Sequence, residues 1–161
     1  MRYGRFGTSA LLGVGAVLAV GLGTAPLATA APAPVAPASA TVTFDCGSFG
    51  SGVATLVASQ NGTAATISGS GSIIAPFAIP ANAVTSTLTL ANASGGTSTF
   101  SGTANPAAAQ GAAFATGPMT GSVNSGDSLT ATTLNLSYPA AGISVNCTAT
   151  TAPAPGPFVF S

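Results

Sequence analysis

Alternation of polar and apolar residues is the feature that most limits the folds open to this chain. Every second residue of Thr41–Cys46 is apolar, and the same period of two returns in Ile143–Thr148. Leu134–Tyr138 alternates in the same way, and so does Thr85–Leu90 except that Ser86 shares the parity of Leu88 and Leu90. Because successive side chains of a strand point to opposite faces, these runs indicate strands with one buried face. Their β-branched Thr, Val and Ile favour the same conformation.

Short turn signals separate the alternating runs. Asn61-Gly62 lies between Val53–Gln60 and Thr63–Ser68 and predicts a hairpin, since both turn residues tolerate a positive φ. Pro76 and Pro80 flank a segment that we expect to be an edge strand or a crossover, because proline cannot donate to a sheet. Two further turn signals are Ser94-Gly95-Gly96 and Ser125-Gly126-Asp127.

These patterns predict one all-β domain over residues 41–151. About seven or eight short strands with regular turns favour an antiparallel sandwich of immunoglobulin-like topology. A small Greek-key barrel is the alternative. The one helix candidate is Pro106–Gln110, which is a single turn at most.

Residues 1–30 have the order of a secretory signal peptide. Arg2 and Arg5 precede an apolar run over residues 10–23, and the small-residue site Ala28-Thr29-Ala30 follows. A transmembrane anchor is the alternative, but the run of about 14 residues is shorter than the roughly 20 needed to cross a bilayer. We expect cleavage near Ala30, with Ala38-Ser39-Ala40 as a second site, and a secreted or cell-wall-associated product without a stable membrane anchor.

Proline-rich segments flank the predicted domain. Residues 31–40 alternate alanine, proline and small residues, which predicts a semi-stiff extended spacer. Residues 152–161 repeat this chemistry as a C-terminal tail. Within that tail, Phe158-Val159-Phe160 is either a last strand or a free apolar end.

Charge is almost absent, and both basic side chains, Arg2 and Arg5, would leave with the signal peptide. The remaining chain keeps Asp45 and Asp127 as its only charged side chains. Nucleic acid is not expected as a partner, because phosphate binding relies on Lys and Arg. The partner is unknown, and the low charge leaves self-association or contact with a cell surface open.

Cys46 and Cys147 are the only cysteines, and export would place them in an oxidising compartment. Each shares the parity of apolar neighbours, Phe44 in the first case and Val145 in the second. Both thiols should therefore face the core and form a disulfide that serves stability alone. A catalytic cysteine would need a neighbouring base, and the chain has no histidine.

The two carboxylates do not predict a catalytic or metal site. Asp45 has the parity of the solvent face of its strand, and Asp127 follows Gly126 in a turn. Glycoside hydrolysis needs two facing carboxylates, and a calcium cage needs more hard ligands than two. We therefore expect no enzyme activity, no catalytic residue, no metal and no cofactor.

Two functions fit these observations. One is a structural or interaction module of the bacterial cell surface or medium. A row of threonines, which is typical of a neutral solvent face, is formed by Thr85, Thr87 and Thr89 and extended by Thr97 and Thr99. The other is a carrier of a small apolar ligand. A filled core with a flat polar face would favour the module. A carrier is favoured by an internal cavity lined by Phe44, Phe77, Phe100, Phe114 or Met119.

The signal sequence, the Ala-Pro segment and the strands Thr41–Cys46 and Ser144–Thr148 together resemble small secreted β-sandwich proteins of actinomycetes, whose families are of unknown function. The composition is also similar to that of the neocarzinostatin-like apoproteins, which hold an apolar chromophore in an immunoglobulin-like sandwich. That resemblance implies the carrier function. Those proteins have two local disulfides, whereas Cys46 and Cys147 would form one long-range bond.

Overall fold

The computed structural model describes residues 34–161, and the predicted signal peptide lies outside them. The described chain is all-β and antiparallel, as predicted, with two short 3-10 helices. Its elements are β1 (Ser39–Asp45), η1 (Gly47–Phe49), β2 (Ser51–Asn61), β3 (Ala64–Ile74), β4 (Thr85–Asn92), β5 (Thr97–Gly102), β6 (Ala113–Ser122), β7 (Ser128–Tyr138), η2 (Pro139–Ala141), β8 (Ile143–Ala149) and β9 (Phe158–Val159).

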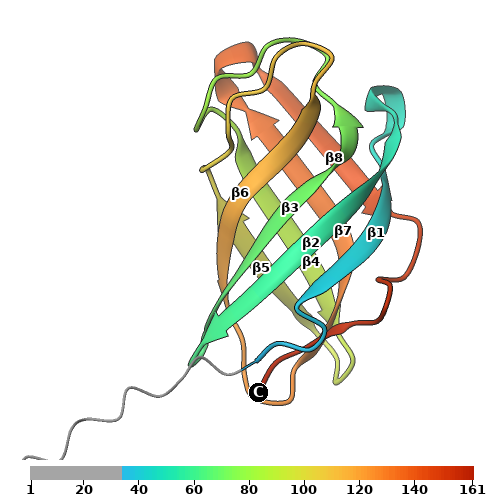
Figure 1. Cartoon of the computed structure of the whole chain (residues 1–161), viewed down its shortest axis with the longest axis vertical. Helices are drawn as coiled ribbons and strands as arrows, with labels where there is room; N and C mark the ends of the chain where they lie inside the picture. Colours follow the sequence, from blue (N-terminus) through green and yellow to red (C-terminus); the bar gives the residue numbers. More distant parts are fainter. Residues whose placement is uncertain (1–33) are drawn as a thin grey trace, which may run out of the picture.

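The strands β1 to β8 form one sheet that closes into a barrel (Figure 1). Their order is β4-β5-β6-β3-β2-β1-β8-β7, and β7 pairs back with β4. Because β4, β5 and β6 follow one another and β7 returns beside β4, the topology contains a Greek key. The predicted immunoglobulin-like sandwich is therefore wrong, and the structure has the barrel of the alternative. Alternation cannot separate the two architectures, since both bury one face of every strand.

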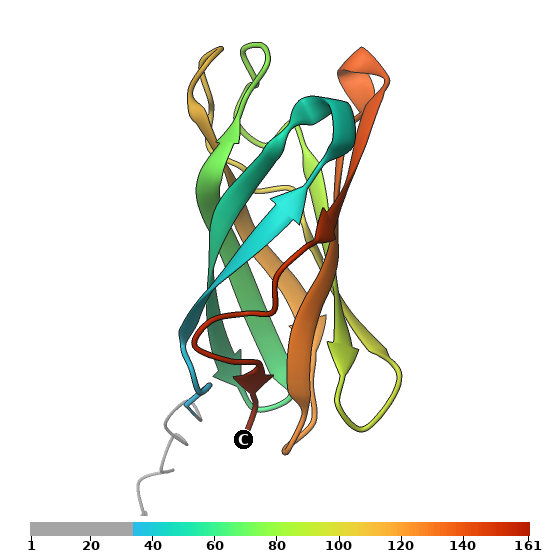
Figure 2. The ribbon, with the colours of Figure 1, turned by 90° about the vertical axis from the view of Figure 1, so that its right-hand side faces the viewer.

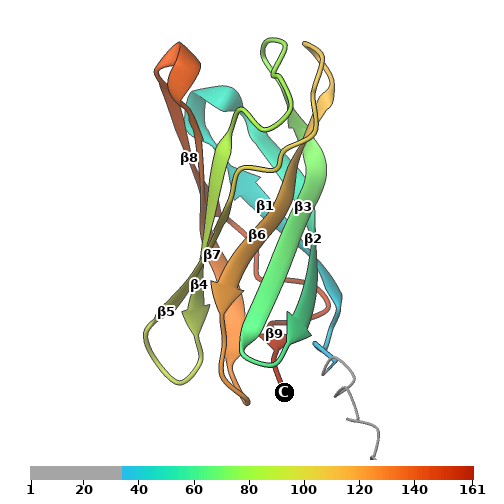
Figure 3. The ribbon, with the colours of Figure 1, turned by 90° about the vertical axis from the view of Figure 1, so that its left-hand side faces the viewer.

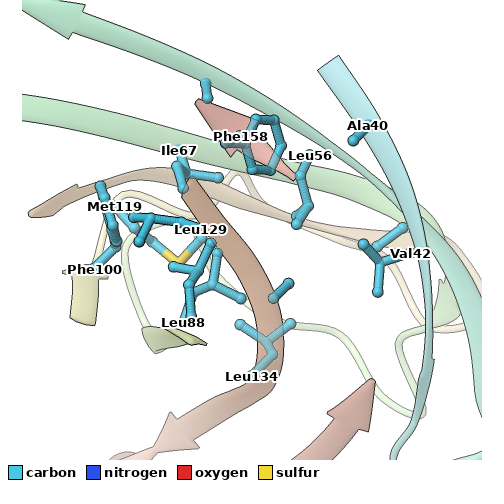
Figure 4. Packing of buried hydrophobic residues seen from close by; sticks show 14 of the residues in the cluster. Ala40, Val42, Leu56, Ile67, Leu88, Phe100, Met119, Leu129, Leu134 and Phe158 are labelled. Atoms are coloured by element: carbon cyan, nitrogen blue, oxygen red, sulfur yellow. The ribbon is translucent and has the colours of Figure 1, made fainter. Parts of the chain in front are cut away.

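Each strand supplies its apolar face to the barrel interior. Figure 4 shows Val42, Leu56, Ile67, Leu88 and Leu129 turned towards this shared core, and each is at most 1% exposed. The interior is filled by side chains over most of its length, as expected for a barrel of about eight strands.

The predicted turns are present, with one shift of register. Asn61 pairs with Ala64, so the β2–β3 loop is Gly62-Thr63 rather than Asn61-Gly62. Gly62 has a φ of 61° at the first loop position, where type II′ turns place glycine. The proposed helical turn at Pro106–Gln110 is absent, because Ala108 forms a bridge with Ile79 of the crossover instead.

The predicted spacer and tail both pack against the barrel over the residues described. Val35 is buried, and the N–H of Ala36 donates to the carbonyl of Val159 at 3.1 Å. Phe158 and Phe160 are at most 1% exposed. The domain limits at 41 and 151 are therefore too narrow, because apolar residues within the Ala-Pro segments complete the core. Figure 2 shows the C-terminal segment passing from β8 across the lower end of the barrel.

The predicted disulfide between Cys46 and Cys147 is present, with an S–S distance of 1.99 Å. It lies at the seam where β1 meets β8, and there the two strands pair only at Phe44↔Ala149 and Asp45↔Thr148. The covalent bond therefore reinforces a seam at which the strand pairing is short. Within residues 34–161, no helix has the length and apolar character to cross a membrane.

Candidate functional site

The end of the barrel opposite the C-terminal segment contains an apolar pocket, which we call the mouth pocket. Its cavity volume is about 60 Å³. The ends of β3 and β7, the starts of β6 and β8, η1 and the β3–β4 crossover surround it, and Figure 3 shows these elements gathered at the upper end. The side chains that form its walls are Ile73, Val84, Phe114, Leu136 and Val145.

A smaller cavity of about 20 Å³, the inner cavity, is lined by residues of the barrel interior. Ile73, Phe114 and Leu136 line both spaces, so they separate the mouth pocket from the inner cavity. Met119 and Leu56 line the inner cavity only. The two spaces therefore adjoin, one nearer the rim and the other further inside.

Glycines of β3 account for the inner cavity. Ile67 and Ile73 are interior residues of this strand, and the positions of the same parity between them are Gly69 and Gly71. Both glycines line the cavity, where they contribute no side chain. A Cβ atom at Gly69 would lie 2.9 Å from Thr116 Oγ1, so glycine also leaves room for that hydroxyl. The N–H of Gly69 donates to Thr116 Oγ1 at 2.8 Å.

An aromatic pair lies at the rim of the mouth pocket. Phe77 and Tyr138 stack with ring centroids 5.9 Å apart and an interplanar angle of 23°. Phe77 comes from the crossover, which is tied to the β5–β6 loop by the hydrogen bonds of Ala75 with Ala112 and of Ile79 with Ala108. Among the lining residues, Tyr138 alone has a hydroxyl.

The rim also exposes apolar surface. Phe49 of η1 is 40% exposed and Ile74 at the end of β3 is 51% exposed, and both line the mouth pocket. Exposed apolar side chains that border an apolar hollow are typical of a binding site rather than of a closed core.

The two carboxylates lie at opposite ends of the barrel and have structural partners. Asp45 ends β1 at the mouth, and its Oδ1 accepts a hydrogen bond from the N–H of Gly47 at 2.9 Å. Asp127, in the β6–β7 turn, accepts hydrogen bonds from Asn92 Nδ2 and the Asn124 N–H, both at 2.7 Å. The structure therefore brings no pair of carboxylates together.

The aromatic residues proposed for a cavity divide into two groups. Phe77 and Phe114 line the mouth pocket, and Phe114 and Met119 line the inner cavity. Phe44 and Phe100 are fully buried in the main core. Sequence reasoning missed Tyr138 as a rim residue and the aliphatic walls. The signal that could have indicated a cavity is the alternation Ser-Gly-Ser-Gly-Ser at 68–72, which removes side chains from one face of a strand.

The predicted threonine row is part of a wider surface, which we call the polar face. Thr85, Thr87 and Thr89 are half-buried on the outer side of β4. Thr99 lies opposite Thr89 and extends the row, as predicted, whereas Thr97 lies opposite Ala91. Neighbouring strands extend the row with uncharged side chains. Beyond the β4 threonines, the polar face consists of Thr99, Ser101, Thr133, Asn135, Ser137, Ser144, Asn146 and Thr148.

Comparison of the chain with protein-family models, curated proteins and solved structures found no match. The candidate functional sites are therefore judged by geometry alone, and the described residues offer two such surfaces. The mouth pocket is concave and apolar, and the polar face is hydroxyl-rich and uncharged. Only the mouth pocket combines concavity with exposed apolar residues at its rim.

Proposed function

We propose that this protein is exported and binds a small apolar ligand, or the apolar end of a larger one, in the mouth pocket without catalysing a reaction. The observation that carries this proposal is the hollow at the mouth of the barrel, whose side chains are apolar except for Tyr138. Barrel mouths are a common location of ligand sites in small β-barrels.

The solvation of the pocket supports binding. A water molecule occupies about 30 Å³ in the liquid, so a cavity of about 60 Å³ has room for about two water molecules. An apolar wall gives such waters few hydrogen-bond partners. Their displacement by an apolar group is therefore favourable, since weakly bound water is exchanged for dispersion contacts.

The chemistry of the lining supports binding rather than catalysis. General acid–base catalysis needs a titratable side chain within hydrogen-bond reach of the substrate. Cys46 lines the pocket, but its sulfur is bonded to Cys147. Tyr138 is the one remaining lining side chain that can exchange a proton.

Export is supported by the order of the first 30 residues, in which a basic segment, an apolar run and Ala28-Thr29-Ala30 succeed one another. A disulfide between residues 101 apart in the chain is compatible with an oxidising compartment. N-terminal sequencing of protein from culture medium tests this part. A start near Ala31 is expected, and intact Met1 on membrane-bound protein would contradict it.

Binding is tested with the neutral fluorescent probe N-phenyl-1-naphthylamine. Val145 lines the mouth pocket, so Val145→Phe should fill it and weaken probe binding by about tenfold or more, which is ~1.4 kcal/mol. Val57 is 51% exposed on the outer side of β2, so Val57→Phe is the matched control. Absence of probe binding, or equal binding by both variants, would refute the proposal.

A second candidate is an interaction module of the cell surface, which the polar face favours. Asn135 and Asn146 lie side by side on this face, with Nδ2 of Asn135 donating to Oδ1 of Asn146 at 2.6 Å. An uncharged hydroxyl and amide surface suits a neutral, hydrogen-bonding partner. Co-sedimentation with isolated cell walls tests this role, with Thr87→Lys expected to reduce sedimentation and Val57→Lys expected to leave it unchanged.

A further inference from the structure

The shape of the space at the mouth limits the shape of the ligand. The mouth pocket and the inner cavity adjoin through Ile73, Phe114 and Leu136, which line both. The inner cavity of about 20 Å³ exceeds the roughly 10–15 Å³ that one water needs, so it has room for about one water-sized group. A narrow chain can occupy both spaces if these side chains change rotamer, whereas a ring system that fits the wider pocket would stop at them.

The chemistry of the inner cavity requires a hydrocarbon end. Thr116 is the only lining residue of this cavity with a polar side chain. Its Oγ1 already accepts a hydrogen bond from the Gly69 N–H and lies 3.4 Å from the Gly69 carbonyl oxygen. A polar ligand end placed there would lose its water without gaining a partner, which is costly.

The mouth favours a neutral head, because none of the lining residues carries a charge that could compensate an ionised head for its lost water. Residues 34–161 contain no Lys, Arg or His, so they offer no side-chain counter-charge to an anionic head. Asp45, next in sequence to the lining residue Cys46, would repel a carboxylate or phosphate. Tyr138 carries the one hydroxyl among the lining residues, and a phenol hydroxyl can both donate and accept a hydrogen bond.

From the two adjoining cavities and the uncharged rim we propose that the ligand is a neutral amphiphile with a single unbranched hydrocarbon chain. The chain end reaches past Phe114 towards Met119, and an uncharged polar head, such as a hydroxyl or an ester, lies beside Tyr138. This inference rests on the proposed binding function and specifies its ligand class.

The first experiment tests how deep the chain reaches. Straight-chain alcohols from butanol to dodecanol compete with N-phenyl-1-naphthylamine for the full-length protein. Affinity should rise about fourfold for each added methylene, which corresponds to the free energy of burying that group, until both cavities are full. Ala54 lines only the inner cavity, so Ala54→Val should move the plateau to shorter alcohols and leave butanol affinity unchanged. A plateau at the same length in both proteins would overturn the inference.

The second experiment tests the head group. Decanol, decanoate and decylamine share one chain length. Decanol should bind about tenfold more tightly than ionised decanoate, because the ionised head would lose water at the mouth without a counter-charge among the lining residues. Decanoate should gain affinity as the pH falls through its own pKa, since the protonated acid is neutral. Ionised decanoate or decylamine binding as tightly as decanol would overturn the neutral head.

Two further readouts separate this inference from the proposed function. Tyr138→Phe removes the hydroxyl and should lower the affinity for decanol more than the affinity for decane. An equal loss of affinity for both compounds would exclude a role for that hydroxyl in binding the head. Naphthalene is a rigid ring system, which we expect to enter at the mouth pocket and to stop before the inner cavity. Displacement of the probe by naphthalene but not by any alcohol would leave the binding function intact and refute the chain-shaped ligand. Failure of the probe itself to bind would refute both.

Discussion

Reduction of the Cys46–Cys147 disulfide should lower the stability of the barrel by about 4 kcal/mol. The bond connects positions 101 residues apart. In the chain-entropy model, a closed loop of about 100 residues contributes about 4.7 kcal/mol, and residual structure in the unfolded chain lowers this figure. The bond lies where β1 and β8 have only two paired positions, so after reduction this seam depends on those pairs and on the hydrogen bonds of β1 with the segment after β8.

Urea unfolding of the oxidised and reduced proteins measures this difference. With an m-value of about 2 kcal/mol per molar urea, a loss of about 4 kcal/mol lowers the midpoint by about 2 M. Cys46→Ala with Cys147→Ala should unfold at a still lower midpoint, because Cys147 is fully buried and its sulfur also fills core volume. Equal midpoints for the oxidised and reduced proteins would refute the reasoning.

The same samples test whether the bond has a second role. Cys46 lines the mouth pocket, and reduction leaves its sulfur in the lining as a thiol. Probe affinity should therefore be retained in reduced protein that is still folded. A large loss of affinity without unfolding would show that the bond also shapes the pocket.

Three further changes have expected outcomes that a urea or thermal unfolding curve can check. Phe160→Ala should destabilise the fold by about 3–5 kcal/mol, since this side chain is 1% exposed and stacks on Phe100, while Val159→Ala, at a 42% exposed position, should have little effect. Gly71→Ala should destabilise strongly because its Cβ would clash with the carbonyl oxygen of Val53, whereas Gly156→Ala, with no described atom within 4 Å of the new Cβ, should be tolerated. Asp127→Ala should cost about 1 kcal/mol or more through the two hydrogen bonds that it removes, and Asp45→Ala, which removes one exposed bond, should cost less.

The strands were predictable because their signal is local. The side chain of each residue in Thr41–Cys46 alternates between core and solvent, and this alternation is written in the order of residues alone. The same parity argument correctly placed both cysteines in the core. The β2–β3 turn shifted by one residue because pairing of Asn61 with Ala64 extends the ladder beyond the turn signal.

Closure of the sheet was not predictable from the same signal. It depends on the pairing of β4 with β7, whose partners Thr85 and Ser137 lie far apart in the sequence. Polar–apolar alternation records which face of a strand is buried but not which strand lies beside it. The role of the tail was missed for a related reason, because Phe158 and Phe160 find the barrel interior only once the strands have closed around it.

The pocket was the least predictable feature, because its volume is the difference between the space that the barrel encloses and the volume of the side chains inside it. Its size depends on how side chains from several strands fill one space, and no single segment records that sum. Part of the cause is nevertheless visible in the sequence. Gly69 and Gly71 occupy interior positions where the flanking Ile67 and Ile73 supply large side chains. A glycine pair on the buried face of a strand is thus a usable sign of a cavity.

Low charge and barrel closure are physically connected in this protein. In many open sheets, charged side chains on the edge strands prevent those strands from pairing with other molecules. Residues 34–161 have only Asp45 and Asp127 for that purpose. A closed barrel removes the edges instead. Where β1 extends beyond its short pairing with β8, the C-terminal segment covers it, because Thr41 and Ala154 exchange backbone hydrogen bonds at 2.8 and 3.0 Å. The backbone groups of the strand edges are thus hydrogen-bonded within the protein. The exposed apolar side chains that remain at the mouth, Phe49 and Ile74, border the pocket and are accessible to a ligand.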